Sequence, residues 1–113
     1  MGKLILSYEL GKIRKQLSKR IIGLCHGGFD ILHNGHLEHF EEAKKNVDIL
    51  IVSVTADKFV IKGPNQPYNN EVNRAKFLLH IKYIDYVVIE LLGSRHLWQT
   101  PLIKSFHRGS APP

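Results

Sequence analysis

The sequence predicts an α/β fold built on a parallel sheet, and three observations lead to this class. Helical periodicity alternates with short apolar runs along most of the chain. The run at residues 48–54 is apolar almost throughout and rich in β-branched residues, as expected for a strand covered on both faces. The chain has 113 residues, the length of one ordinary domain. Helices that alternate with parallel strands cover both faces of the sheet, so we expect three layers, α/β/α.

The first predicted element is an amphipathic helix at residues 8–19. Ser7 can cap its N-terminus, and Leu10, Ile13 and Leu17 recur at helical spacing. The basic side chains of this segment lie largely off that apolar stripe. We therefore expect the helix to pack its apolar side on the rest of the domain.

A buried strand is predicted at residues 21–25, because a compact apolar run there ends in a His-Gly-Gly turn. A helix then begins near Asn34. Its apolar side is expected to comprise Leu37, Phe40, Ala43 and Val47. Acidic and lysine side chains occupy the rest of the helix surface, and the two elements form a strand-turn-helix unit.

A loop and a helix separate the second and third predicted strands. Residues 48–54 form the central strand, and residues 55–70 hold the Gly, Pro and Asn residues typical of a loop. Asn70 can cap a helix over residues 71–81. Its buried side is expected to comprise Val72, Ala75, Leu78 and Leu79. A third strand follows at residues 85–90, and the order α-β-α-β-α-β predicts a Rossmann-like architecture with right-handed crossovers.

Three segments are expected along the chain: an N-terminal amphipathic helix at residues 1–20, one α/β domain at residues 21–90 and an atypical tail at residues 91–113. The tail lacks sustained periodicity and ends in Gly-Ser-Ala-Pro-Pro. We expect it to be poorly ordered and the fold to be truncated at its C-terminus.

The formal net charge of +6 invites a nucleic-acid hypothesis, which the distribution of the charge weakens. Residues 1–20 carry six basic residues against one acidic residue, and residues 91–113 carry three basic residues and no acidic one. Residues 21–90 carry seven basic residues against nine acidic ones. The well-patterned part of the chain therefore offers no basic groove for a polyanion, and we expect no nucleic-acid partner. A small basic nucleic-acid-binding domain is the weakest alternative.

The apolar runs and the cysteine content indicate where in the cell the protein is located. The longest apolar stretches are broken by Asp48 and Asp85, whereas a transmembrane helix needs ~18 or more consecutive apolar residues. We expect no membrane contact. The single cysteine, Cys25, cannot form an intrachain disulfide, which fits a reducing compartment. We expect a cytoplasmic protein.

The stretch that carries chemistry runs from His26 to His36, since an open parallel sheet binds ligands at the carboxyl ends of its strands. Two glycines let the backbone turn, and the following helix presents N–H groups and the positive end of its dipole to an anion. His33 and His36, three residues apart at the helix start, can both donate hydrogen bonds to phosphate oxygen atoms. Gly35 between them leaves room for a nucleotide.

These histidines could instead have structural roles, because histidines are common at helix starts, where they cap the helix or pack against it. A zinc site is a further alternative, because His33, His36 and His39 recur every third residue. Successive members diverge by about 60° on a helix with 3.6 residues per turn, and no acidic or cysteine ligand converges with them. We therefore expect no metal ligand among these residues.

An aromatic-Asp segment followed by His-x-Gly-His resembles the signature of the nucleotidyltransferase superfamily. The segments that carry the resemblance are Gly28-Phe29-Asp30, His33-Asn34-Gly35-His36, Thr55-Ala56-Asp57-Lys58-Phe59, Lys62-Gly63-Pro64, Asn73-Arg74 and Tyr83-Ile84-Asp85-Tyr86-Val87-Val88. The Gly-x-Gly-x-x-Gly and P-loop patterns are absent from the sequence. The chain is most similar, over residues 21–90, to the cytidylyltransferase-like group that contains glycerol-3-phosphate cytidylyltransferase and the heptose-1-phosphate adenylyltransferase domain of lipopolysaccharide synthesis.

The resemblance implies a reaction in which a sugar or alcohol phosphate attacks the α-phosphorus of CTP or ATP and expels pyrophosphate, for the assembly of cell-surface polysaccharide. The implied catalytic residues are His33, His36 and Lys62. The implied nucleotide-binding residues are Gly28, Phe29, Asp30, Gly35 and Arg74. Mg²⁺ bound with the triphosphate would complete the charge neutralisation, and the resemblance also implies a homodimer.

Other interpretations stay open for the single residues: Phe29 as a core residue, Asp57 as a turn former, and Lys62 and Arg74 as solvated charges. The resemblance also ends after the third strand. Residues 91–113 show no Ser/Thr-rich motif of the kind that closes over the nucleotide in the family. Loss of that segment, or an altered reading frame, would leave a non-catalytic nucleotide-binding or dimerisation module, which is the alternative function.

Overall fold

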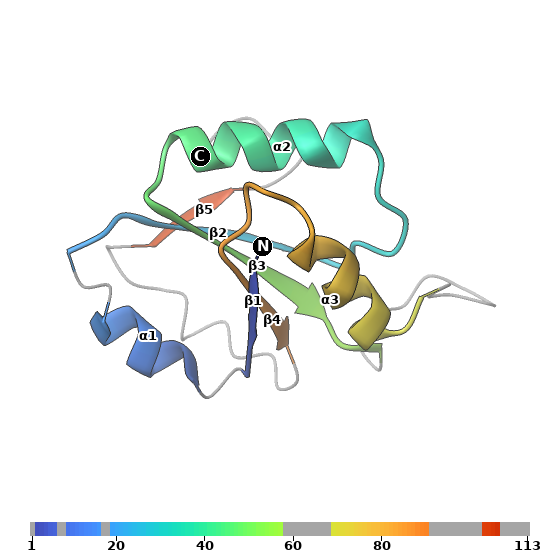
Figure 1. Cartoon of the computed structure of the whole chain (residues 1–113), viewed down its shortest axis with the longest axis horizontal. Coiled ribbons are helices and arrows are strands. Elements are labelled where there is room, and N and C mark those ends of the chain that lie inside the picture. Colours follow the sequence, from blue (N-terminus) through green and yellow to red (C-terminus); the bar gives the residue numbers. More distant parts are fainter. Residues whose placement is uncertain (1, 7–8, 17–18, 58–68, 91–102, 107–113) are drawn as a thin grey trace.

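The computed structural model describes residues 2–6, 9–16, 19–57, 69–90 and 103–106. Within these ranges lie the strands and helices β1 (Lys3–Ile5), α1 (Leu10–Gln16), β2 (Ile22–Gly27), α2 (Asn34–Lys45), β3 (Ile49–Thr55), α3 (Glu71–Leu79), β4 (Tyr86–Glu90) and β5 (Ile103–Phe106) (Figure 1). None of the helices in these ranges is long and apolar enough to cross a membrane.

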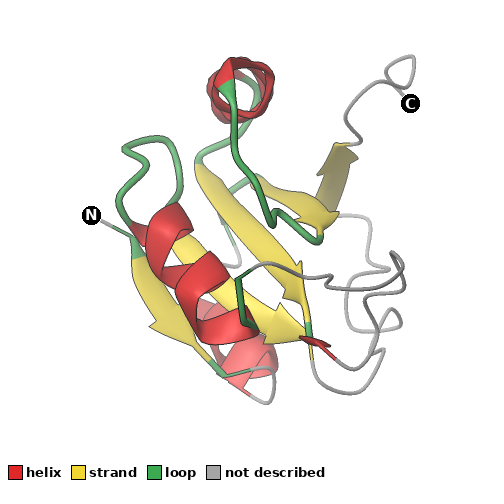
Figure 2. Ribbon diagram, turned by 90° about the vertical axis from the view of Figure 1, so that its right-hand side faces the viewer, coloured by secondary structure: helices red, strands yellow, loops and turns green. Residues whose placement is uncertain are grey.

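The five strands form one parallel sheet in the order β1-β4-β3-β2-β5. The helix α1 covers one face, and α2 and α3 cover the other, so the domain has three layers (Figure 2). This confirms the Rossmann-like α/β/α prediction with a parallel sheet.

Two hydrophobic layers hold the helices to the sheet. Successive side chains of β3 point to opposite faces, because a strand has a period of two residues. On the face of α2 and α3 the buried residues include Phe40, Ala43, Leu50, Val52, Val54, Ala75, Leu78 and Val87. On the face of α1 they are Ile5, Ile13, Ile22, Leu24, Ile51 and Val88. The central strand is thus buried on both sides, as its apolar run predicts.

The helices and strands predicted within residues 8–90 are confirmed, with ends that coincide or differ by up to three residues. Two short strands were missed. The strand β1 pairs with β4 through Leu4 and Val87, so the N-terminal segment contributes to the same sheet as the rest of the chain. The strand β5 pairs with β2, and it lies inside the tail that was predicted to be poorly ordered. The structure describes only residues 103–106 of this tail, as a strand, and the prediction of poor order stays a prediction.

Two side chains predicted to be buried are exposed. Leu37 of α2 is 40% exposed and Val72 of α3 is 47% exposed. The helix α3 instead buries Arg74 beside Ala75 and Leu78. The helix is therefore rotated relative to the predicted apolar side, because a charged side chain with protein partners takes the inner position.

Candidate functional site

The turn between β2 and α2 is built around a strained aromatic residue. Phe29 has a φ of 50°, the left-handed conformation that non-glycine residues rarely adopt, and no other non-glycine residue in the described ranges has a positive φ. Its ring folds back over the end of β2, where a Cβ atom on Gly27 would lie 3.0 Å from the Phe29 Cζ atom. Glycine at position 27 therefore permits the close approach of the ring to the strand, since a Cβ atom there would displace the ring.

His33 and His36 form a reciprocal cap at the start of α2. His33 occupies the N-cap position with an extended backbone, and its Nδ1 accepts a hydrogen bond from the Gly35 N–H at 3.0 Å. The His33 N–H donates to Nδ1 of His36 at 3.2 Å. The two rings lie 4.2 Å apart between centroids. The capping role considered for these residues is thus confirmed, and their role toward a phosphate stays a prediction.

The cap also determines where each imidazole carries its proton. Because Nδ1 of His33 and Nδ1 of His36 both accept a backbone N–H, the neutral rings hold their proton on Nε2. Each ring can then donate a hydrogen bond through Nε2–H. The first turn of α2 contains no acidic residue, so the positive end of the helix dipole is not offset there. The helix dipole therefore favours an anion such as a phosphate at this end, while the N–H groups of Gly35, His36 and Leu37 are bonded to His33.

Asp30 fastens the turn to the segment that precedes α3. Its side chain is 7% exposed, and its Oδ1 accepts a hydrogen bond from the Asn69 N–H at 2.8 Å. The Asn69 side chain returns a second bond, from Nδ2 to the Asp30 carbonyl oxygen at 2.9 Å. Asn69 belongs to a stretch that the sequence indicated only as a loop, and its Asn-Asn pattern before a helix signals no more than a cap. This residue was missed.

Arg74 is fully buried and donates hydrogen bonds to three protein segments. Nη1 donates to the Gly28 carbonyl at 2.8 Å, Nε to the Asn69 carbonyl at 3.0 Å, and Nη2 to the Asp57 carboxylate at 2.5 Å. The alternative that Arg74 is a solvated charge is wrong. Its expected contact with the triphosphate stays a prediction, since the observed partners of the guanidinium are protein oxygen atoms.

The structure brings most of the candidate residues into one connected group. Contacts join Gly28, Phe29, Asp30, His33, Gly35, His36 and Arg74. Asp57 enters the group through its ion pair with Arg74, and it lies two residues after the end of β3. Lys62 lies outside the described residues, and its assignment stays a prediction.

The third histidine of the zinc alternative has a different partner. His39 Nε2 lies 3.5 Å from the Cys25 sulfur, beneath the helix and against β2. Burial raises the pKa of the Cys25 thiol to about 12, so Cys25 stays protonated and is neither a ready metal ligand nor a nucleophile. Over the described part of the chain, no group of three His, Cys, Asp or Glu side chains is placed to hold a metal ion.

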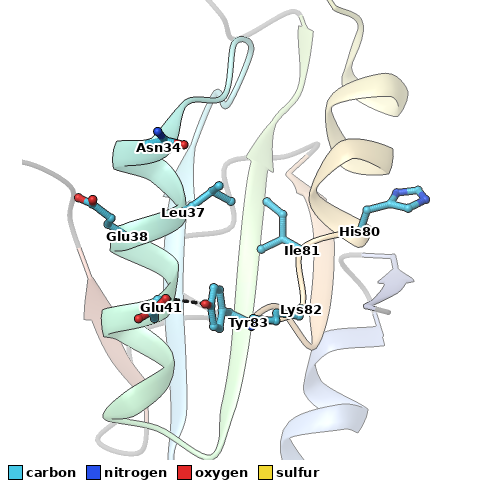
Figure 3. Close-up of a pocket in the computed structure, with 8 residues that line it drawn as sticks. All are labelled: Asn34, Leu37, Glu38, Glu41, His80, Ile81, Lys82 and Tyr83. Atoms are coloured by element: carbon cyan, nitrogen blue, oxygen red, sulfur yellow. Dashed lines mark hydrogen bonds between the residues drawn. The ribbon is translucent and has the colours of Figure 1, made fainter.

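A separate open groove of about 540 Å³ lies between α2 and the loop before β4 (Figure 3). Its lining residues are Asn34, Leu37, Glu38, Glu41, His80, Ile81, Lys82 and Tyr83. Tyr83 donates a hydrogen bond to Glu41 at 2.5 Å, which lowers the pKa of the Glu41 carboxyl and raises the pKa of the Tyr83 hydroxyl. Leu37 owes its exposure to this groove.

A parallel sheet in which β2 leads through a glycine-rich turn into the capped, positive end of α2 is the arrangement typical of α/β proteins that bind nucleotides. A family model described as "Cytidylyltransferase-like" matches residues 24–94. The chain belongs to the cytidylyltransferase-like family, as its motifs predict.

Relatives of known name match the same region. The "Bifunctional protein HldE" of Aliarcobacter butzleri (strain RM4018) is 44% identical over 75 residues, which are 65% of this chain and 16% of the relative. The protein of the same name from Campylobacter jejuni (strain RM1221) is 41% identical over 83 residues, 72% of this chain and 18% of the relative. The chain thus spans less than a fifth of the length of these relatives.

A solved structure supports the fold. The crystal structure of the lipopolysaccharide core biosynthesis protein from Thermoplasma volcanium GSS1 superposes with a TM-score of 0.62 at 30% sequence identity. The match covers 68% of this chain and 63% of that protein.

Proposed function

We propose that this chain performs nucleotidyl transfer from CTP or ATP to a sugar or alcohol phosphate, in the synthesis of precursors for lipopolysaccharide or another cell-surface polysaccharide. The observation that carries the proposal is the His33–His36 cap at the start of α2. Both Nδ1 atoms accept backbone N–H groups, so each ring carries an Nε2–H donor beside the positive end of a helix.

The proposed reaction is a single displacement at phosphorus. A phosphate oxygen of the acceptor forms a bond to the α-phosphorus, and the bond from that phosphorus to the bridging oxygen of the β-phosphate breaks. The electron pair of the broken bond leaves with pyrophosphate. Negative charge gathers on the transferring and leaving groups, and donors that are already in place stabilise it. The two histidines donate hydrogen bonds to the α-phosphate in this scheme, and no covalent intermediate on the protein is involved.

The remaining candidate residues have supporting roles in the proposal. Lys62 would neutralise the triphosphate, and Gly28, Asp30 and Gly35 would shape the turn around it. Mg²⁺ would enter with the triphosphate and shield its charge. We further propose a cytoplasmic homodimer, in keeping with the family resemblance.

Support for the polysaccharide context comes from what the matched proteins are called. One is a lipopolysaccharide core biosynthesis protein, and the others share the name "Bifunctional protein HldE". Because the chain spans less than a fifth of those relatives, their whole activities do not transfer with the match.

Pyrophosphate release is the direct test. The chain is assayed with CTP and with ATP in the presence of Mg²⁺, each with glycerol 3-phosphate or heptose 1-phosphate as acceptor. Acceptor-dependent release that is lost in His36→Ala and kept in His80→Ala supports the proposal. His80 is the matched control because it is an exposed histidine at the C-terminal end of α3 and not part of the His33–His36 cap.

Nucleotide binding, measured by calorimetry on the same proteins, separates the alternatives. Binding without release identifies the non-catalytic nucleotide-binding module. If the chain shows neither nucleotide binding nor pyrophosphate release, both proposed functions are overturned and the family assignment still holds.

A further inference from the structure

The strained residue of the turn lies between two residues, Gly28 and Asp30, whose carbonyl groups another part of the chain holds. Phe29 lies in the left-handed region, where a bulky side chain is unfavourable. Such a conformation persists only when its surroundings determine it. The carbonyl before it, on Gly28, accepts a hydrogen bond from Arg74 Nη1, and the carbonyl after it, on Asp30, accepts one from Asn69 Nδ2.

The two residues that hold the turn are themselves joined. The Asn69 carbonyl accepts a hydrogen bond from Arg74 Nε, and the Asn69 N–H donates to the Asp30 carboxylate. Arg74 is fully buried, so its bonds are shielded from water, and Asp57 pairs with its remaining nitrogen. Asn69 and Arg74 thus act on the turn as one unit.

The conformation they maintain has a consequence for His36. The Phe29 ring meets the His36 ring edge to face, with centroids 5.9 Å apart and planes at 71°, and it also packs on Phe40 at 5.5 Å. Phe40 is completely buried, so it gives the Phe29 ring a rigid support. A relaxed backbone at Phe29 would redirect its ring and remove one of the contacts that orient His36.

We infer that Asn69 and Arg74 are positioning residues, which hold Phe29 in its left-handed conformation and through its ring set the orientation of His36. The catalytic consequence of this role rests on the proposed nucleotidyl transfer. The positioning itself is a property of the folded chain and is measurable without substrate.

The test is the contact between the two rings in solution. In the wild-type protein, nuclear Overhauser effects between Phe29 and His36 ring protons are expected, together with a ring-current shift of the His36 Hε1 resonance. In Asn69→Ala and in Arg74→Lys both signals should weaken or disappear. In Asn70→Ala they should persist, because Asn70 is the neighbouring exposed residue, and the bond of its side chain is to the Asn73 N–H at the start of α3.

Persistence of the ring contact in folded Asn69→Ala overturns the inference. Arg74→Lys removes a buried group and risks unfolding, so Asn69→Ala, which removes one side-chain donor, is the deciding variant. Kinetics provide a second measurement where turnover is present: kcat should fall about ten- to hundred-fold in Asn69→Ala with KM changed little, because misplacement of a reacting group affects the transition state. A KM effect with unchanged kcat also overturns it.

Failure of the proposed function gives a different pattern. A wild-type protein without turnover but with a ring contact that depends on Asn69 leaves the positioning role intact. Turnover together with a contact that Asn69→Ala does not change leaves the proposed function intact and removes the positioning role.

Discussion

Nη2 of Arg74 lies 2.5 Å from Oδ1 of Asp57, and this ion pair joins α3 to the segment that follows β3. The guanidinium is fully buried, whereas the Asp57 side chain is 40% exposed. The positive charge therefore depends on partners inside the protein, and Asp57 is the only one among its three observed hydrogen-bond acceptors that carries a negative charge.

Asp57→Ala should lower the free energy of unfolding by about 1–3 kcal/mol. Removal of one partner of a fully buried pair costs about 3–5 kcal/mol, and the partial exposure of Asp57 reduces this, since water can take its place. Urea unfolding measures the change. The control is Glu42→Ala, which removes an exposed carboxylate 3.8 Å from Lys45 and should change stability by less than about 0.5 kcal/mol. Equal effects of the two substitutions would show that the Arg74 pair contributes no more than a surface pair.

Stability should fall in alkaline solution because of Cys25. Burial raises the pKa of the folded thiol from its ordinary value of 9.0 to about 12. Above pH 9 the unfolded chain releases this proton and the folded chain retains it. Ionisation therefore lowers the free energy of the unfolded state, and the free energy of unfolding falls progressively up to pH 12. Each pH unit in this window is worth about 1.4 kcal/mol.

The comparison with Cys25→Ala isolates this effect from other groups that titrate in alkali. Between pH 8 and pH 10.5 the wild-type protein should lose about 2 kcal/mol more stability than the variant, as followed by denaturant unfolding at each pH. Parallel losses in the two proteins would mean that the folded thiol ionises as readily as the unfolded one.

Local patterns predicted the fold well where an element is long and buried. The apolar run of β3 and the periodicity of α2 indicated the type of each element, and the run also indicated that β3 is covered on both faces. The strand β1 was not predicted because it has only three residues. It is recognisable only by its pairing with Tyr86–Val88, which lie far from it in the sequence. No local pattern reports such a partner, and β5 was missed for the same reason.

The sequence located the candidate site but did not predict how its residues are connected. The His-x-Gly-His motif located the helix start, and the flanking glycines located the turn. The left-handed residue is Phe29, however, which sequence reasoning does not expect of an aromatic side chain. The burial of Arg74 depends on oxygen atoms from three separate segments, so its position follows from the tertiary structure and not from the charge pattern of α3.

Because the backbone at Phe29 is left-handed, a glycine at this position should be more stabilising than an alanine, the reverse of the usual order. Phe29→Gly and Phe29→Ala both remove the ring, and they differ only in the backbone conformations they allow. At φ 50° glycine is free of the penalty of about 1–2 kcal/mol that alanine bears, so Phe29→Gly should be the more stable variant by about 1 kcal/mol. Thermal unfolding of the pair measures the difference.

An exposed helix position provides the control for this comparison. At Glu38 in α2, the alanine variant should be more stable than the glycine variant by about 1 kcal/mol, the ordinary order for a helix interior. The same order at both positions would exclude a left-handed conformation of Phe29 in solution.

Gly27→Ala should disturb the site from beneath the ring. The new Cβ atom would lie 3.0 Å from Cζ and 3.2 Å from Cε2 of Phe29, so the ring must move away from β2 and its contact with His36 changes. Overpacking of this kind costs about 1–3 kcal/mol of stability, and pyrophosphate release should fall with it.

The matched control is Gly11→Ala in α1, where a Cβ atom meets no atom within 4 Å and where alanine favours the helix by up to about 1 kcal/mol. Opposite signs of the two stability changes, measured by urea unfolding, are the expected result. A Gly27→Ala protein as stable and as active as Gly11→Ala would mean that the Phe29 ring does not rest on the end of β2.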